Sequence, residues 1–406
     1  MNGTIPPHIQ EQVEFTKAVY TYLIPVMIVI LLFAIIGNGI IVLAAPYLSK
    51  PISPYLKLCV SLAAADMWAA SLLICGLVVN SFLPVVLGQV RTTQCPTAYL
   101  EMFRIAGMLT SDLHLFALAI NQFFGTYWPL KYKIMVTTRR IRLIILSLWI
   151  IPIIFVAIWF VQDPYDGLRH PACVMQFYNR LPFRVTIFLT FMPPLITTLL
   201  IYGLILSKLL KARAEFEMSI NERKLKVRRS NVQSKLKLVW TTLLIVSTFS
   251  LSWGACVLYF VLVCNEGCLF IYKESISFYL GMFLGSTVNF LVMLKLAVNP
   301  FIYTLRIKAI RSSVDNFFNV FCRKRNYESA NLSNDTNDFA TEIEFFQLHS
   351  SNNKQQEQTL DFVYHVLLDA RYLLLLPPIT SNYTRIFLPR QRLPPRMRRQ
   401  IHQRLT

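Results

Sequence analysis

Charged residues interrupt otherwise apolar stretches of this chain, among them Asp66, Glu101, Arg104, Asp112 and Lys295. An ionised side chain in a low-dielectric surrounding is costly unless it is paired or faces a polar interior. We therefore expect these side chains to face the inside of a helix bundle. Charges at such positions mark functional sites, so Asp66, Asp112, Arg104 and Lys295 are the first residues to test.

Catalytic chemistry is not indicated. The sequence has no His/Cys set with zinc spacing, no P-loop and no nucleophile elbow, and its six His residues are scattered. We therefore expect no enzyme activity, no cofactor and no metal site.

Seven apolar stretches, each long enough to cross a bilayer as a helix, must position the charges. Charged residues make up only 15% of the 406 residues, against about a quarter in soluble domains, and hydrophobic residues make up 55%. The stretches cover residues 20–45, 56–82, 99–124, 142–161, 183–210, 237–263 and 276–304. The sequence predicts an all-α membrane protein, a seven-transmembrane helix bundle, and its polar N-terminus resembles no cleavable signal peptide.

The distribution of basic residues predicts the orientation. Lys and Arg outnumber Asp and Glu by 40 to 21, a net charge of +19, and the segments 46–57, 131–142, 208–237 and 305–325 carry this surplus. The positive-inside rule puts these alternate segments in the cytosol and the N-terminus outside. A nucleic-acid-binding protein would cluster its basic residues on one face, so we expect no nucleic-acid partner.

Motifs occur in order along the predicted spans. They are Asn38 in span one, Asp66 in an LAxxD pattern in span two, Asn121-Gln122-Phe123 at the end of span three, Trp149 in span four, Pro194 and Tyr202 in span five, Phe249 and Trp253 in span six, and Asn299-Pro300 with Tyr303 in span seven. Together these motifs resemble the rhodopsin-like (class A) G-protein-coupled receptors over about residues 20–322.

The resemblance implies a plasma-membrane receptor that transmits the binding of an extracellular ligand to heterotrimeric G proteins. A non-signalling or scavenging receptor is the alternative, and a transporter or channel fits the motifs less well. The resemblance also implies a disulfide between Cys95 and Cys173. Cys264 and Cys268 either form a second disulfide or remain two free thiols.

Lys295 occupies a position where the family has a polar residue. In relatives, the residues matching Asp66, Ser111 and Asn299 help to hold a sodium ion. We hypothesise that the Lys295 ammonium replaces this ion as the counter-charge of Asp66, because either charge alone is costly in the membrane. Asp112 is a second acid, either protonated or sharing Lys295, and the alternative is that Lys295 points elsewhere.

The Asn121-Gln122-Phe123 box departs from the Asp-Arg-Tyr of the family. In relatives the Arg pairs with the adjacent Asp and often with an acid at the foot of span six, where this chain has Lys235. We therefore expect the lock of the inactive state to be absent, which either raises basal activity or weakens coupling. Such a pair contributes about 1 kcal/mol or less, so the fold should survive its loss.

Span six also lacks the proline that usually kinks it. The residue at that position is Ala255, so the expected cause of a kink is missing there, although Gly254 offers some flexibility. Pro300 should kink span seven.

The external half of the bundle is the expected ligand pocket. Amine receptors carry an Asp where this chain has Arg104, which argues against a small amine. Together with Arg184, Arg104 favours an anionic ligand or a peptide C-terminus. The alternative is internal pairing of Arg104 with Glu101. Further pocket candidates are Met108, Thr186, Trp253, Phe260, Asn289 and Met293.

The expected domain plan has four parts. They are an extracellular N-terminus over 1–19, the receptor domain over 20–304, a short amphipathic helix on membrane lipid over 305–325, and a largely disordered cytoplasmic tail over 326–406. Asn2 is a glycosylation sequon or a chance match, and Cys322 is a palmitoylation site or a free thiol.

Overall fold

The computed structural model describes residues 7–89, 93–217, 222–264, 267–271 and 277–320. Seven helical segments in it are long and apolar enough to cross a membrane, which confirms the predicted number of spans. They are α1 (Pro7–Ala44), α2 (Pro54–Gly76) with the π-helical η2 (Leu77–Val86), α3 (Cys95–Tyr127), α5 (Thr138–Val161), α6 (Leu181–Glu217), α7 (Glu222–Phe249) with the π-helical η5 (Ser250–Gly254) and α8 (Ala255–Leu262), and α9 (Phe278–Arg306).

Short elements connect these segments. They are the 3-10 turns η1 (Ala45–Tyr47), η3 (Gly167–Arg169) and η4 (Phe177–Asn179), the helix α4 (Pro129–Met135), and the strands β1 (Val263–Cys264) and β2 (Phe270–Ile271). The two strands pair in parallel, with Val263 opposite Phe270. Residues 308–320 form a further helix after α9.

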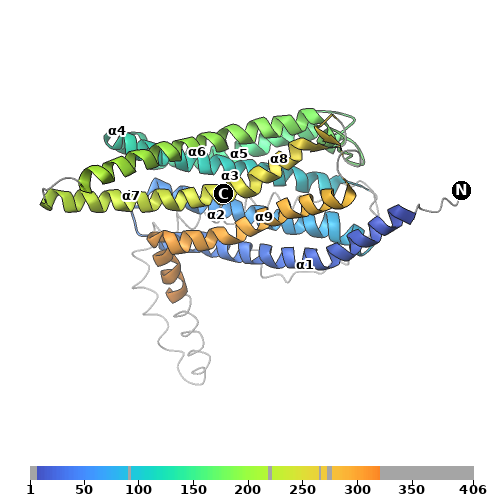
Figure 1. Ribbon diagram of the computed structural model, residues 1–406, viewed down its shortest axis with the longest axis horizontal. Helices are drawn as coiled ribbons and strands as arrows, with labels where there is room; N and C mark the ends of the chain where they lie inside the picture. Colours follow the sequence, from blue (N-terminus) through green and yellow to red (C-terminus); the bar gives the residue numbers. More distant parts are fainter. Residues whose placement is uncertain (1–6, 90–92, 218–221, 265–266, 272–276, 321–406) are drawn as a thin grey trace, which may run out of the picture. The chain divides into compact units, whose positions relative to one another are not determined.

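The bundle has two chemically different ends (Figure 1). The start of α1 and the strand pair lie at one end, which we call the disulfide end because Cys95 and Cys264 lie there. The other end carries α4 and the helix over 308–320, and we call it the α4 end.

Hydroxyl side chains cap the N-termini of three of the spans. Ser53 accepts a hydrogen bond from Leu56 N before α2, Thr137 from Arg140 N before α5, and Ser277 from Leu280 N before α9. Such N-caps satisfy backbone N–H groups that the first helical turn leaves without a partner. The local sequence therefore determines where these helices start.

α3 is the central helix of the bundle. In its most apolar window 67% of the residues are buried, whereas the same share is 17–39% in the other six spans. α3 packs against α2, α5 and α6. Polar groups on α3 therefore face other helices, so its charged side chains can contact polar groups inside the bundle.

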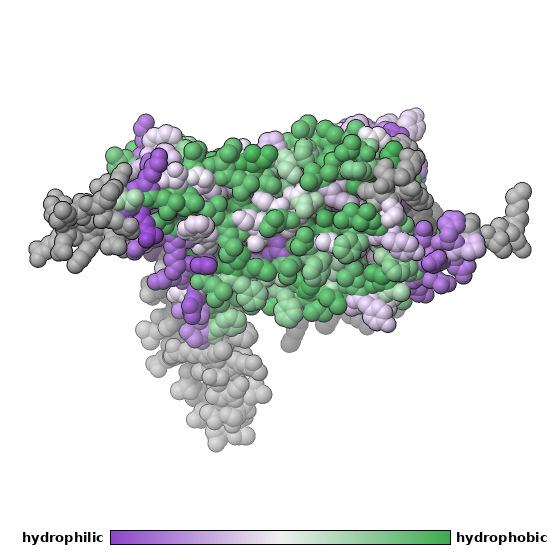
Figure 2. All heavy atoms as spheres, in the orientation of Figure 1, coloured by the Kyte–Doolittle hydropathy of each residue, from purple (hydrophilic) through white to green (hydrophobic). Residues whose placement is uncertain are grey.

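A band of hydrophobic residues covers the middle of the bundle, and hydrophilic residues gather at its two ends (Figure 2). Large apolar side chains such as Phe33, Leu143 and Leu200 are exposed in the spans. An exposed apolar surface of this kind is what a bilayer requires.

The sixth span is irregular despite its lack of proline. The α-helical pattern stops at Phe249, continues as a π-helix over Ser250–Gly254, and resumes at Ala255. The Ser252 hydroxyl donates to the carbonyls of Thr248 and Phe249, which the wider turn leaves accessible. The sequence lacks the proline that usually kinks this span. The π-helical turn that includes Trp253 distorts the span instead.

Candidate functional site

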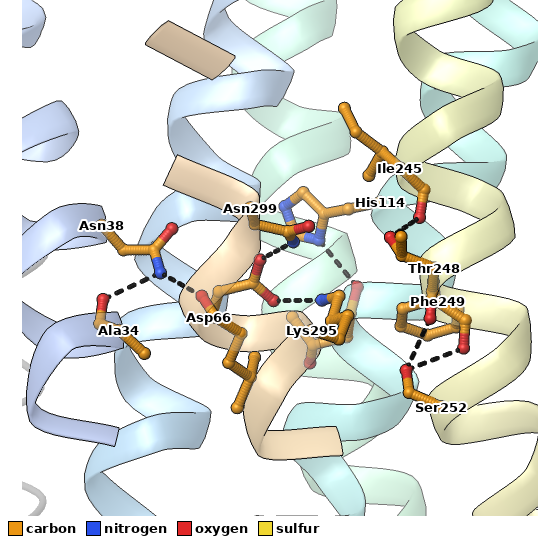
Figure 3. A network of polar contacts seen from close by, with 12 residues as sticks. Ala34, Asn38, Asp66, His114, Ile245, Thr248, Phe249, Ser252, Lys295 and Asn299 are labelled. Atoms are coloured by element: carbon orange, nitrogen blue, oxygen red, sulfur yellow. Dashed lines mark hydrogen bonds and ion pairs between the residues drawn. The ribbon is translucent and has the colours of Figure 1, made fainter. Parts of the chain in front are cut away.

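An ion pair lies at the centre of the bundle (Figure 3). Lys295 Nζ in α9 is 2.7 Å from Asp66 Oδ1 in α2, and the two side chains are 2% and 0% exposed. Asn299 Nδ2 donates to the other Asp66 oxygen at 2.5 Å. The structure therefore brings Asp66, Lys295 and Asn299 together, as the sequence hypothesis requires.

The surroundings of this pair complete its solvation. Lys295 Nζ lies 5.1 Å from the centre of the Phe249 ring, which is a cation–π arrangement. Asn38 Nδ2 donates to Ala34 O in its own helix and to Leu296 O in α9. α1 and α9 approach closely here because Gly37 has no side chain. A Cβ added to Gly37 would lie only 2.9 Å from the Pro300 ring. The Gly37-Asn38 pair thus holds α9 in place beside the ion pair.

Asp112 is a contrasting acid in α3. Its side chain is 1% exposed, and within the described part of the chain neither carboxyl oxygen has a hydrogen-bond partner. Ser111 is likewise buried. Lys295 pairs with Asp66 rather than with Asp112 in this structure.

A neutral network connects α2, α3 and α5. Trp149 Nε1 donates to Ser61 Oγ at 3.1 Å, and Ser61 Oγ lies 2.8 Å from His114 Nε2. His114 Nδ1 lies 2.8 Å from the Thr110 carbonyl, which can only accept, so Nδ1 carries the proton and Ser61 donates to Nε2. Ser61 and His114 were not predicted as functional residues from the sequence. A His in an apolar helix was the available signal.

The α4 end holds a second set of contacts between helices. Gln122 Nε2 in α3 donates to Thr242 Oγ1 in α7 at 2.8 Å, and the same oxygen lies 3.2 Å from Tyr55 OH in α2. This contact differs from the charged lock of the family. The charged lock is missing, but a neutral hydrogen bond joins the third and sixth spans instead.

The neighbours of Gln122 are also engaged. Tyr132 OH in α4 donates to Asn121 Oδ1 at 2.9 Å, and burial raises the pKa of Tyr132, which keeps this donor protonated. Phe123 stacks on Tyr127 with the ring centres 4.5 Å apart and meets Trp128 edge-on. The Asn-Gln-Phe box thus makes neutral contacts at each of its three positions.

Two disulfides close the opposite end. Cys95 and Cys173 are bonded, which confirms the predicted bridge between α3 and the loop after α5. Cys264 and Cys268 are bonded as well. Of the two alternatives for this pair, the structure contains the disulfide rather than two free thiols.

Arg104 pairs within its own helix. Its Nε and Nη2 atoms lie 2.9 and 2.6 Å from Glu101 Oε2, and the two side chains are 22% and 20% exposed. Tyr178 from the loop joins this pair through its hydroxyl. The internal alternative for Arg104 is therefore the arrangement that the structure contains.

Arg184 is buried and bound to the protein's own backbone. Its guanidinium donates to the carbonyls of Tyr178, Phe260 and Val263 at 3.0, 2.7 and 2.6 Å, and it lies over the Phe260 ring. A guanidinium engaged in this way offers no open fork to a carboxylate. The pairing of Arg104 and Arg184 around an anion, expected from the sequence, is not the arrangement found.

The other predicted pocket residues differ in burial. Met108, Trp253 and Met293 are 4%, 1% and 1% exposed. Thr186 and Asn289 bond to carbonyls of their own helices, at Pro182 and Gly285. Thr186 is half-buried and Asn289 is exposed, so these candidates do not share one buried position.

The remaining motif residues are helical and mostly buried. Phe249 stacks on Phe191 with ring centres 5.7 Å apart, and Tyr202 and Tyr303 are fully buried. Pro194 and Pro300 lie inside α6 and α9. Asn2, Cys322 and the tail over 326–406 lie outside the described residues.

Relatives of the chain include alpha-2B adrenergic receptors. The receptor of Equus caballus is 34% identical over 134 residues, which are 33% of this chain and 32% of the relative. The receptor of Dugong dugon is 33% identical over 122 residues, 30% of each chain. The chain therefore spans about a third of the length of the curated relatives it matches.

A family profile covers far more of the sequence. The profile described as "7 transmembrane receptor (rhodopsin family)" matches residues 37–303, from the glycine before Asn38 to Tyr303. This range includes the ion pair, the neutral network and the contacts of Gln122 and Arg104 described above. The chain belongs to the rhodopsin family of seven-transmembrane receptors.

Proposed function

We propose that this protein is a plasma-membrane receptor that binds a ligand at the disulfide end and acts on heterotrimeric G proteins at the α4 end. Disulfides form in oxidising compartments, which supports an external disulfide end. The basic segments between the spans favour a cytosolic α4 end.

The hydrogen bond from Gln122 to Thr242 is the observation that carries the proposal. It joins α3 to α7 at the end proposed to meet the G protein, and Tyr55 extends it to α2. A neutral hydrogen bond contributes about 1 kcal/mol net. Ligand binding can supply this difference between two states, so the bond is a resting contact that an agonist can open.

Nucleotide exchange on a panel of purified G proteins tests this proposal. Thr242→Val removes the hydroxyl and keeps the shape, and we expect basal exchange to rise about fivefold, the factor that corresponds to about 1 kcal/mol. Thr241→Val is the matched control because, among the residues that the structure describes, the Thr241 hydroxyl bonds only to Lys237 O in its own helix. Equal exchange for the wild type and both variants would contradict the resting contact, and exchange no faster than without receptor would favour the alternative of a non-signalling receptor.

Lys295 has a role in the same proposal as the built-in counter-charge of Asp66. It stands where relatives bind a sodium ion, and its ammonium lies 2.7 Å from the carboxylate. Ligand affinity should therefore not depend specifically on sodium. A strong preference for sodium over potassium would contradict this role.

The proposal also includes the lipid contacts of the helix over 308–320. Phe318 is exposed, while Ser313 bonds to Ala44 O and Phe317 meets Tyr47, which ties the helix to the end of α1. Its exposed basic residues and Phe318 suit an amphipathic helix on anionic lipid. The glycan at Asn2, the palmitate at Cys322 and the disordered tail remain predictions.

A further inference from the structure

The loop between α5 and α6 is held rigidly over the disulfide end. The Asp166 carboxylate accepts hydrogen bonds from the backbone N–H groups of Gly167, Gln176 and Phe177 at 2.7–2.8 Å. Cys173, inside the same loop, is bonded to the first residue of α3. A loop fixed by its own contacts can hold one side chain in a defined place.

Tyr178 is the side chain that this loop presents to α3. Its ring packs against Phe183 and Phe260, with ring centres 5.6 and 5.4 Å away. Its carbonyl accepts a hydrogen bond from Arg184 Nε. These contacts hold the Tyr178 ring next to the Glu101–Arg104 pair in α3.

The Tyr178 hydroxyl bridges an acid and a base. It donates to Glu101 Oε2 at 2.9 Å and accepts from Arg104 Nη2 at 3.0 Å. Burial, together with the Glu101 carboxylate, raises the pKa of Tyr178, so the hydroxyl keeps its proton. The position therefore requires one group that donates and accepts at the same time.

A charged group meets this requirement poorly. An anion would pair with Arg104 but would be repelled by Glu101, and a cation would meet the opposite problem. A phenol, an alcohol or a primary carboxamide satisfies both neighbours. The Glu101 and Arg104 side chains keep about a fifth of their exposure, so a small molecule has access to them.

We propose that Tyr178 occupies the ligand position of the resting receptor and that the ligand group replacing it is an uncharged donor–acceptor, foremost a phenol. This inference rests on the proposed function only in placing the ligand at the disulfide end. It replaces the anionic ligand expected from the sequence, because that expectation treated Arg104 as unpaired.

The test uses the full chain in detergent or nanodiscs, with Tyr178→Ala and 4-methylphenol as the probe. The variant should lose thermal stability, because it loses the ring and leaves Glu101 and Arg104 without the hydroxyl. At ten times its Kd, 4-methylphenol should raise the Tm of the variant by about 3 °C and leave the wild type unchanged. Tyr165→Ala is the matched control, since Tyr165 lies in the same loop and is 85% exposed.

Three further compounds decide the chemistry of the position. Toluene has the ring without the hydroxyl, 4-methylbenzoate carries a negative charge, and 4-methylbenzylamine carries a positive one. We expect each to stabilise Tyr178→Ala less than 4-methylphenol does. An equal effect of toluene, a larger effect of either ion, or the same response in Tyr165→Ala would overturn the proposal.

A second variant guards against loss of the fold. Tyr178→Phe keeps the ring, and we expect its Tm to fall because only the hydroxyl is gone; an unchanged Tm would show that the hydroxyl is not engaged. If Tyr178→Ala unfolds on extraction, its yield at the cell surface with each compound should follow the same order. These measurements need no G protein, so they stand or fail separately from the exchange assay.

Discussion

Two acid–base pairs in this receptor have the same chemistry and opposite surroundings. Asp66 and Lys295 come from α2 and α9, and their side chains are 0% and 2% exposed. Glu101 and Arg104 come from one turn of α3 and are 20% and 22% exposed. The first pair joins distant parts of the chain, whereas the second is local.

The difference separates a structural pair from an adaptable one. Breaking a fully buried pair leaves a charge in a low-dielectric interior, and that charge has no water to replace its partner. A partly exposed pair is screened, and water or a ligand can replace a partner at small cost. We therefore expect the central pair to hold the bundle together and the pair in α3 to take part in recognition.

The largest effect is expected from Lys295→Met, which leaves the Asp66 carboxylate buried and unpaired. Losing one partner of such a pair destabilises a protein by about 3–5 kcal/mol. The measurement is Tm and the yield of folded receptor. Asp66→Asn combined with Lys295→Met removes both charges and should recover part of this loss. A double variant no more stable than Lys295→Met would contradict this view of the pair.

An intermediate effect is expected from Ser61→Ala. It removes the partner of both Trp149 and His114. A buried polar group without a partner costs about 1–3 kcal/mol, so this neutral network should rank between the two ion pairs. Ser71→Ala is the control, because within the described part of the chain the Ser71 hydroxyl bonds only to Met67 O in its own helix. If Ser61→Ala and Ser71→Ala lower the Tm equally, the neutral network does not contribute to stability as predicted.

The smallest effect on stability is expected from Arg104→Met, at about 1 kcal/mol or less. A molar salt concentration should shrink this effect further, since exposed charges are screened, and should leave the cost of Lys295→Met unchanged. Thermal unfolding at low and high salt measures both. A loss as large as that of Lys295→Met would end the distinction between the pairs.

The sequence predicted the central pair but not the way the outer pair is used. Asp66 and Lys295 could be matched because Lys295 stands where the family has a residue of the sodium site, although Asp112 remained a second candidate partner. Arg104 had two candidate partners, an external ligand and Glu101 one turn earlier, and the spacing allowed the second without excluding the first. Tyr178 decided between them, and it lies in a loop more than seventy residues further along the chain.

The same limit applies at the α4 end. The absence of the Arg and of the acid was readable from Asn121-Gln122-Phe123 and Lys235. The replacement was not, because Thr242 is one of several hydroxyl residues in its span and only the packing of α7 on α3 brings it within 2.8 Å of Gln122.

By itself, the sequence predicted the seven spans, and its resemblance to the receptor family implied the disulfide between Cys95 and Cys173. The hydroxyl side chains that cap three of the spans are also a local feature of the sequence. Hydrophobicity and capping are local properties that add up along a segment, so they can be read without knowing the neighbours. Only the tertiary structure decided which polar groups meet: Gln122 with Thr242, His114 with Ser61, and Tyr178 with Glu101 and Arg104. A hydrogen bond depends on a few tenths of an ångström and on direction, and those depend on how the helices and the loop pack.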